Sequence, residues 1–312
     1  MAKTLVYQLY PLAWNGLNEM TEHLARIKKL NVDYVWLGPL CMLPTFVDDE
    51  GVDGYKIIDR RFGTMQDFDN FVETAHKLGI KVLMEISIDP VYPYYIYEVN
   101  DWFDSSGRLN FGLLRKFRRI VKFWLHKHSI DGFSVRIARD VDKKEDKSLN
   151  SSNRLSYEQA TDIVNLIFGN MSTRDGKNPF LITECYDDSY GLLVDYICCY
   201  AGVNFVMNSG LRNSVENGLG DFDAKFHLST SSHNFMLNLE SPNTQRFTTR
   251  SGLSPTTIAE WIFESDAKGI CIYQGQEIGV ENSTRSPLPL EKYNEQGLFG
   301  LYCFETKRWK NR

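Results

Sequence analysis

The sequence predicts an α/β fold, a closed (β/α)8 barrel, for three reasons. Its 312 residues, 43% of them hydrophobic, are enough to bury a large core. Short β-rich apolar runs alternate with longer amphipathic stretches from one end of the chain to the other, which is typical of repeated β/α units around a parallel sheet. Eight such units occupy about 250 residues. We therefore expect residues 1–312 to form a single barrel domain.

Eight apolar runs have the length and composition of buried barrel strands. They are Leu5–Tyr10, Tyr34–Leu37, Val82–Ile86, Gly132–Ile137, Phe180–Glu184, Val203–Met207, Phe235–Asn238 and Gly269–Tyr273. In barrels of this kind the functional residues lie at the carboxyl ends of the strands, whereas residues at the amino ends contribute to packing and stability. Polar residues that end these runs are therefore the functional candidates.

Seven stretches between and after the strands show the apolar periodicity of amphipathic helices. They are Asn18–Lys29, Thr64–Leu78, Leu113–His128, Tyr157–Phe168, Leu211–Leu219, Thr256–Glu264 and Gly297–Trp309. Asn18 with Thr21, and Thr64 with Asp67, supply the polar caps and early acids expected at helix starts. Residues 140–153 are rich in Lys, Asp and Ser, which predicts a mobile loop on the functional face.

Charge and composition argue against several classes of partner. The net charge of −5 and pI near 5.8 disfavour nucleic acid or an anionic membrane as the main partner. The densest basic stretch, 115–127, interleaves cations with apolar residues, which indicates a helix with one solvated face rather than a nucleic-acid patch. No apolar run approaches the roughly 18 residues of a membrane span, and no signal peptide is evident. We expect a cytoplasmic location, reduced cysteines, and no metal or cofactor.

Several segments together resemble the α-amylase family, glycoside hydrolase family 13, along essentially the full chain. They are Val6-Tyr7-Gln8-Leu9-Tyr10-Pro11, Val35-Trp36-Leu37-Gly38-Pro39, Ile58-Asp59-Arg60-Arg61-Phe62-Gly63-Thr64, Ala75-His76-Lys77-Leu78-Gly79-Ile80-Lys81-Val82-Leu83 and Tyr273-Gln274-Gly275-Gln276-Glu277-Ile278-Gly279. The resemblance implies an amylase-like barrel with its active-site residues at the ends of strands three, four, five and seven.

Strand four departs from this family where its nucleophile belongs. The family pattern Gly-Phe-Arg-x-Asp reads Gly132-Phe133-Ser134-Val135-Arg136 here, so Ser134 and Arg136 stand for the family's arginine and nucleophilic aspartate. A guanidinium stays protonated and has no lone pair to offer an anomeric carbon, so it cannot form a covalent glycosyl intermediate. We therefore expect no catalytic residues and interpret the chain as a pseudoenzyme.

The other family positions are partly degenerate. Strand three ends in Glu85 and Asp89, with a proline where the family has histidine, and strand seven reads Asn238-Leu239-Glu240 in place of Asn-His-Asp. Strand five keeps its acid, Glu184.

Arg136 then faces two acids, and we expect it to form bidentate ion pairs with Glu184 and Glu240. Such pairing would lower the pKa of Glu184 and keep it ionised, the wrong state for a proton donor.

If the cleft still binds a sugar, the resemblance supplies a short set of candidate contacts. They are Tyr55, Glu85, Asp89, Ser134 and Asn238. Tyr55 lies in Gly54-Tyr55-Lys56, which keeps two letters of the family's Gly-Tyr-Asp, and a packed tyrosine explains it equally well. Tyr10, Trp36 and Tyr273 near strand ends are equally ambiguous.

Within the family, the closest pattern is the heavy-chain ectodomain of heteromeric amino-acid transporters. The interval 91–109 is too short for the family's inserted second domain, and the chain stops without the usual C-terminal β-sandwich. The spacing from Asp48-Asp49 to Phe62-Gly63 and the Val135-Arg136 pair are also similar. This resemblance implies a protein partner, and an excised ectodomain is then the alternative to a cytoplasmic protein.

Three functional hypotheses follow. The first is an inactive barrel that serves as an interaction or scaffold module. The second is a divergent α-glucan or α-glucoside hydrolase or transferase that uses Glu184 as general acid with Glu240, Glu85 or Asp89. The third is a binding protein for an α-glucan or oligosaccharide. Inverting chemistry, with carboxylates roughly 6.5 to 9.5 Å apart, keeps the second open.

Overall fold

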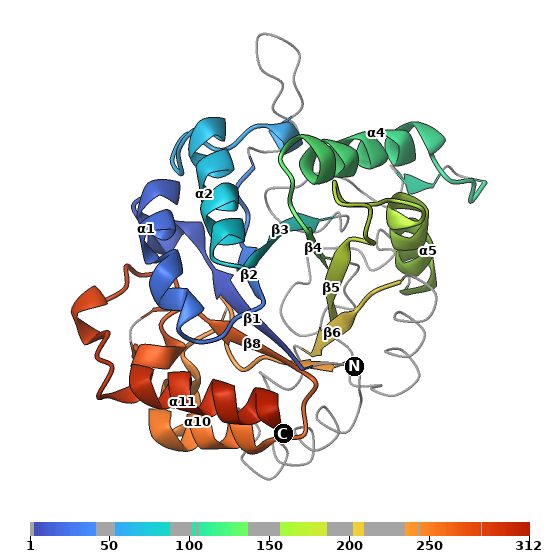
Figure 1. Ribbon diagram of the computed structural model, residues 1–312. Helices are drawn as coiled ribbons and strands as arrows, with labels where there is room; N and C mark the ends of the chain where they lie inside the picture. The colour runs from blue at the N-terminus through green and yellow to red at the C-terminus, as the bar shows by residue number, and fades with distance from the viewer. Residues whose placement is uncertain are drawn as a thin grey trace.

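The computed structural model describes residues 3–41, 54–87, 102–103, 106–136, 157–185, 202–208, 235–242, 244–281 and 283–312. Eight parallel strands close into a barrel in the order β1 to β8, and helices surround it (Figure 1). The strands are β1 Thr4–Leu9, β2 Tyr34–Leu37, β3 Lys81–Ser87, β4 Gly132–Arg136, β5 Phe180–Cys185, β6 Phe205–Asn208, β7 Phe235–Leu237 and β8 Gly269–Tyr273. The predicted barrel is confirmed, and each strand lies within two residues of its predicted ends.

The described helices follow the predicted periodic stretches, except for the short helix α9, which was not predicted. They are α1 Leu17–Lys28, α2 Met65–Lys77, α4 Phe111–Lys122 continued by the π-helix η3 Phe123–Lys127, α5 Tyr157–Phe168, α9 Phe247–Ser251, α10 Pro255–Glu264 and α11 Leu298–Asn311. The predicted helix 211–219 and the predicted loop 140–153 lie outside the described residues. The interval between β3 and α4 is 88–110, a little longer than the predicted 91–109.

Of the two helix caps that the sequence predicts, the one at α2 is present and the one at α1 is not. At α2 the predicted cap forms a capping box: the Thr64 hydroxyl accepts from the Asp67 N–H at 3.2 Å, and the Asp67 carboxylate accepts from the Thr64 N–H at 2.8 Å. The cap predicted at Asn18 and Thr21 is wrong. Helix α1 begins after Gly16, whose φ of 96° suits glycine, and the Thr21 hydroxyl donates to a carbonyl four residues earlier inside the helix.

Strand alternation divides the core into two clusters. One set fills the barrel interior: Val6, Tyr34, Trp36, Leu83, Ile182, Phe205, Met207, Met236 and Cys271. The opposite strand faces pack against the helices in a larger cluster. At Gly132 a Cβ would lie 1.9 Å from the Phe180 carbonyl oxygen, so the approach of β4 to β5 requires glycine.

A repeated device fixes the amino ends of the strands. In three places an Asp or Asn that comes directly before one strand accepts, through its side chain, a backbone N–H at the start of the preceding strand, each at 2.8 Å. The pairs are Asp33 with Leu5, Asp131 with Val82, and Asn204 with Leu181. The amino face of the barrel is therefore held by side-chain acceptors at alternate strand pairs.

Of the cysteines whose side chains are described, Cys41, Cys271 and Cys303 form no disulfide. Among the described helices, none has the length and apolarity needed to cross a bilayer.

Candidate active-site face

The strand register places the predicted site positions Glu85, Ser134 and Glu184 on the neighbouring strands β3, β4 and β5. Ser134 on β4 lies opposite Glu85 of β3 and Ile182 of β5, and Glu184 lies opposite Met207 of β6. Ser134 is buried and Glu85 is half-buried.

Three of the predicted site residues, Arg136, Glu184 and Asp89, are described only in part or not at all. The backbones of Arg136 and Glu184 end or nearly end β4 and β5, but their side chains, and Asp89 entirely, lie outside the described residues. An ion pair between Arg136 and Glu184 thus remains a prediction.

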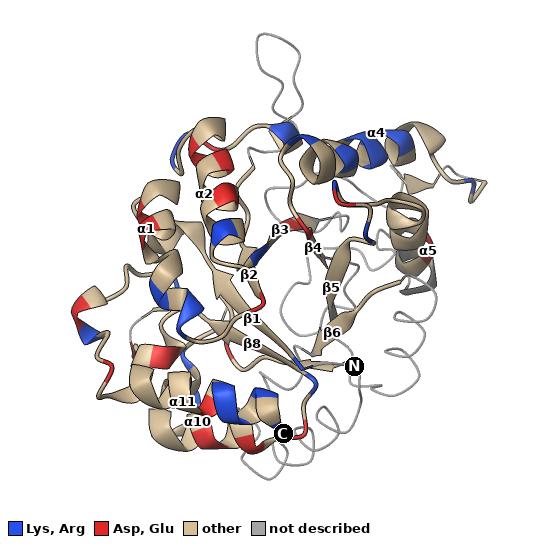
Figure 2. Ribbon diagram, in the orientation of Figure 1, with Lys and Arg blue, Asp and Glu red and all other residues tan. Residues whose placement is uncertain are grey.

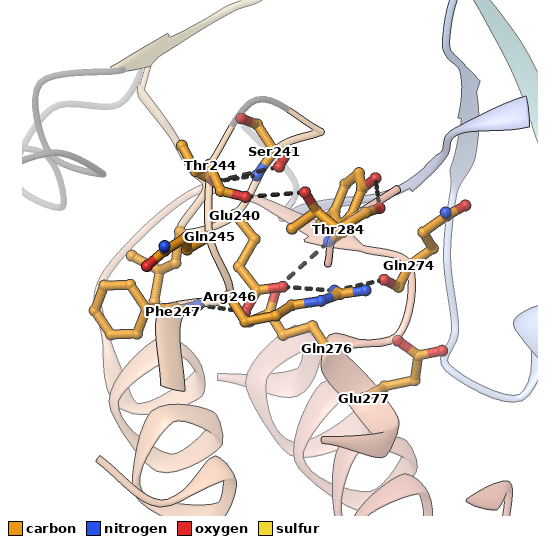
Figure 3. Close-up of polar contacts among 12 residues, drawn as sticks. Glu240, Ser241, Thr244, Gln245, Arg246, Phe247, Gln274, Gln276, Glu277 and Thr284 are labelled. Atoms are coloured by element: carbon orange, nitrogen blue, oxygen red, sulfur yellow. Dashed lines mark hydrogen bonds and ion pairs between the residues drawn. The ribbon is translucent and has the colours of Figure 1, made fainter. Parts of the chain in front are cut away.

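The acid after β7 is bound at both oxygens. Glu240 Oε2 accepts from Arg246 Nη1 at 2.8 Å, and Glu240 Oε1 accepts from the Phe247 N–H at 2.8 Å (Figure 3). The same Arg246 nitrogen donates to the Gln274 carbonyl, also at 2.8 Å. Glu240 therefore joins the end of β7 to the first turn of α9 and, through Arg246, to the loop after β8.

This ion pair is buried. Relative exposure is 2% for Glu240 and 1% for Arg246, so each charge depends on the other to offset the loss of hydration. The guanidinium that contacts Glu240 belongs to Arg246. The pairing of Glu240 with Arg136 stays a prediction, because the Arg136 side chain lies outside the described residues. Arg246 was not predicted as the partner of Glu240. It lies in the segment between β7 and α9, and no local sequence pattern specifies the path of that segment. Its position beside Phe247, at the start of a short helix, was the available signal.

The side chain of Gln274 connects this cluster to the residues that follow β1. Its side-chain oxygen accepts from the Tyr10 N–H and from Trp14 Nε1, both at 2.7 Å. The Arg246 guanidinium lies 5.3 Å from the centre of the Tyr273 ring, within cation–π range. Tyr273 is fully buried, so its ring presents no open face for stacking on a sugar.

A second acid after β8, Glu277, is also enclosed. Its Oε1 accepts from the hydroxyls of Tyr7 and Tyr293, each at 2.7 Å, and its other oxygen makes no hydrogen bond in the described structure. Burial raises the pKa of Glu277, with the two tyrosine hydrogen bonds opposing the rise. Burial also raises the pKa of both tyrosines. Glu277 thus ties β1 to the segment before α11.

The remaining candidate contacts are packed. Asn238 is 2% exposed, and its Nδ2 donates to the Cys271 carbonyl at 3.3 Å. Tyr55 is 3% exposed, with its ring 5.4 Å from that of Phe117 and its carbonyl accepting from Trp124 Nε1 at 2.9 Å. This arrangement corresponds to the packed alternative for Tyr55.

Chemically, the described acids on this face are not equivalent. Glu240 and Glu277 have their hydrogen bonds directed at protein groups, and a general acid or base must reach a substrate proton within about 2.6 to 3.2 Å. In this arrangement neither Glu240 nor Glu277 is positioned to act on a substrate.

The closed eight-stranded parallel barrel is similar to the barrels of amylases and related glycoside hydrolases. Residues 13–109 match the α-amylase catalytic domain family. A trehalose-6-phosphate hydrolase from Bacillus licheniformis has a TM-score of 0.75 at 16% identity, covering 100% of this chain and 84% of that one. A maltogenic α-amylase from Thermotoga neapolitana has a TM-score of 0.69 at 18% identity, with coverages of 99% and 77%. At such identities the likeness shows the fold alone.

Curated relatives are similar over shorter stretches. An oligo-1,6-glucosidase from Heyndrickxia coagulans is 32% identical over 116 residues, 34% of this chain and 20% of the relative. Alpha-amylase 3 from Dictyoglomus thermophilum is 22% identical over 241 residues, 64% of this chain and 45% of the relative. The matched part thus spans less than half the length of either relative.

Proposed function

We propose that this chain is an amylase-like barrel that recognises a partner, either a protein or an α-glucan, without cleaving glycosidic bonds. The observation that carries the proposal is the buried pairing of Glu240 with Arg246. A retaining glycosidase needs two working carboxyl groups about 5 Å apart. Glu240 could serve as one only by breaking its buried ion pair, and Arg136 stands where the family keeps its nucleophile.

The sequence resemblance to the transporter heavy-chain ectodomain supports a protein-binding role. It rests on the Val135-Arg136 pair at the end of β4 and on the short interval between β3 and α4. Such a role needs the barrel as a rigid frame and places no demand on paired carboxylates.

Turnover of maltooligosaccharides and aryl α-glucosides tests the proposal directly. The wild-type protein and Glu184→Gln should release sugar at the same background rate. Clear hydrolysis by the wild type that Glu184→Gln abolishes would overturn the proposal. Glu240→Gln is a poor substitute in this test, because it also disturbs a buried ion pair.

A second candidate is a divergent α-glucoside hydrolase or transferase with Glu184 as general acid. The names of the matched relatives, which include glucosidases, amylases and a trehalose-6-phosphate hydrolase, favour it, as does the position of Glu184 near the end of β5. Its base would be Glu85 or Asp89, acting by inversion across roughly 6.5 to 9.5 Å. Inverted anomeric product in NMR, lost in Glu85→Gln or Asp89→Asn, would establish this reading.

A separate measurement tests whether the cleft binds an α-glucan without cleaving it. Calorimetric titration with maltose and isomaltose should give binding heat if an α-glucan is the partner. Heat in the absence of turnover supports sugar recognition, and the absence of heat directs the search to a protein partner.

A further inference from the structure

The segment containing α4 is the most basic part of the molecule. Residues 105–130 contain seven Lys or Arg and no Asp or Glu, whereas the rest of the chain has 28 Lys or Arg against 40 Asp or Glu. Figure 2 shows blue at several positions along α4 and no red. An acidic protein thus carries one concentrated basic surface on the outside of its barrel.

Three cations and one aromatic residue line the solvent face of α4. Phe111, Arg115, Arg119 and Lys122 follow one another at intervals of four, four and three residues, which places them on one helix face over about 16 Å. Phe111 is 62% exposed, and the three cations are exposed. None of the three has a hydrogen-bond or ion-pair partner within the described structure. We call Arg115, Arg119 and Lys122, with Phe111 at their head, the α4 basic stripe.

The stripe is separate from the contacts that hold α4 in place. The opposite face of the helix buries Leu113, Leu114, Phe117, Ile120 and Val121. Arg118, on the same helix, donates to the carbonyls of Ile167 at 3.2 Å and Gly169 at 3.3 Å, at the end of α5. The fold therefore uses Arg118 and leaves the charges of the stripe free of structural duty.

We propose that the α4 basic stripe docks an acidic segment of a partner protein. Carboxylates of the segment pair with Arg115, Arg119 and Lys122, and an apolar or aromatic residue of the segment packs on Phe111. Charge complementarity of this kind steers association and selects partners. The surface lies on the outside of the barrel, so this inference holds whether or not the cleft is catalytic.

The extent of the stripe favours a short acidic segment over other anionic partners. A long nucleic acid would run beyond about 16 Å onto a remainder of the chain with excess Asp and Glu. On the described part of α4, a membrane surface would find Phe111 as the one exposed large apolar residue, because the apolar face of the helix is buried. A symmetric contact with a second copy would set the stripe against itself, since a two-fold interface uses the same patch twice.

The experiment compares two triple variants of the full chain with the same change in net charge. One reverses the stripe, Arg115→Glu with Arg119→Glu and Lys122→Glu. The control reverses three exposed cations outside α4: Arg60, Lys292 and Lys307. The probes are poly-L-glutamate and a glutamate–tyrosine copolymer, titrated at low and physiological salt. Wild type and control should bind poly-L-glutamate, and the stripe variant should bind at least about tenfold more weakly.

Phe111 provides an independent readout. Wild type should bind the glutamate–tyrosine copolymer more tightly than poly-L-glutamate, and Phe111→Ser should remove that difference while leaving poly-L-glutamate binding in place. Should the charge reversal impair folding by circular dichroism, the neutral variant Arg115→Gln with Arg119→Gln and Lys122→Gln replaces it.

Three outcomes would overturn the proposal. They are absent binding by the wild type, equal weakening in the stripe and control variants, and tighter binding of oligothymidylate or phosphatidylserine vesicles than of the acidic polypeptides.

Discussion

Acidic side chains at both ends of the barrel accept hydrogen bonds from other groups of the protein. This structural role is expected of acids at the amino end but not of acids at the carboxyl end. At the amino face, Asp33 and Asp131 accept backbone N–H groups at strand starts. At the carboxyl face, where chemistry belongs in this fold, Glu240 accepts from Arg246 and from a backbone N–H, and Glu277 accepts from two tyrosines. The comparison teaches that acids at the catalytic end of a barrel are evidence of function only when their oxygens face the cleft.

The largest expected effect comes from breaking the buried pair at the carboxyl face. Arg246→Met leaves Glu240 buried without its cation, so the free energy of unfolding should fall by about 3–5 kcal/mol. The double variant Arg246→Met with Glu240→Met removes both charges and should recover much of that loss. Urea unfolding of wild type, single and double variants measures both quantities.

Arg250→Met is the matched control for this comparison. Arg250 lies on α9, the helix that Arg246 directly precedes, and its guanidinium donates to the carbonyls of Leu239 and Gln245. Arg250→Met should lower the free energy of unfolding much less than Arg246→Met does. If the two single variants are equally destabilised, Glu240 does not depend on Arg246, and the structural role given to this acid fails.

Glu277 predicts a pH dependence at the same end of the barrel. Burial raises its pKa above the ordinary value of 4.5, so above that value the folded state holds a proton that the unfolded chain has released. Stability therefore falls as pH rises from the unfolded pKa towards the folded pKa. Glu277→Gln keeps a neutral acceptor for Tyr7 and Tyr293 and removes this term. Its stability relative to wild type should rise with pH across that window.

Chemical denaturation at a series of pH values measures the slope for Glu277. The Gln variant also carries an amide N–H₂ where the acid had an unpaired oxygen, which shifts stability by a constant amount at every pH. The prediction therefore concerns the slope only. Parallel curves for the two proteins would show that Glu277 is ionised alike in folded and unfolded states.

The amino face should respond more mildly. Asp131 accepts from the Val82 N–H and from His76 Nε2, each at 2.8 Å. Asp131→Ala leaves the Val82 N–H without this acceptor, and should cost about 1–3 kcal/mol. Asp131→Asn keeps a side-chain oxygen and should cost less. Equal losses in the two variants would mean that charge, rather than the backbone hydrogen bond, is what this position supplies.

Sequence reasoning recovered the barrel because its signal is periodic. Apolar runs and amphipathic stretches recur, and an error of one or two residues at a strand end, as at β6, leaves the topology unchanged. The Thr64–Asp67 box was predicted because both partners lie within one helical turn. The Asp33 and Asp131 contacts were not, because each partner lies on another strand, and in sequence each acid looks like an ordinary turn residue.

The candidate site was harder to predict for the same physical reason. Sequence alignment with a family pattern places Glu240 at a strand end but does not specify which cation reaches it. That choice depends on the path from β7 into α9, which brings Arg246 onto the carboxylate and Phe247 into position to donate its N–H. Family position suggested Arg136 as the partner of Glu240, and nothing in that position pointed to Arg246.

The smallest effect is expected at an exposed pair on the amino face, and it sharpens the contrast with Glu240. Asp175 is exposed and pairs with Lys177. Its hydrogen bond with Lys177, then that with Thr173, lowers the pKa of Asp175 to about 2. Lys177→Ala should return that pKa towards 3.8, observable by NMR titration, without a measurable change in unfolding, because water replaces the lost partner. A marked loss of stability would show that exposed acids at this end also hold the fold, and the distinction between buried and exposed pairs would fail.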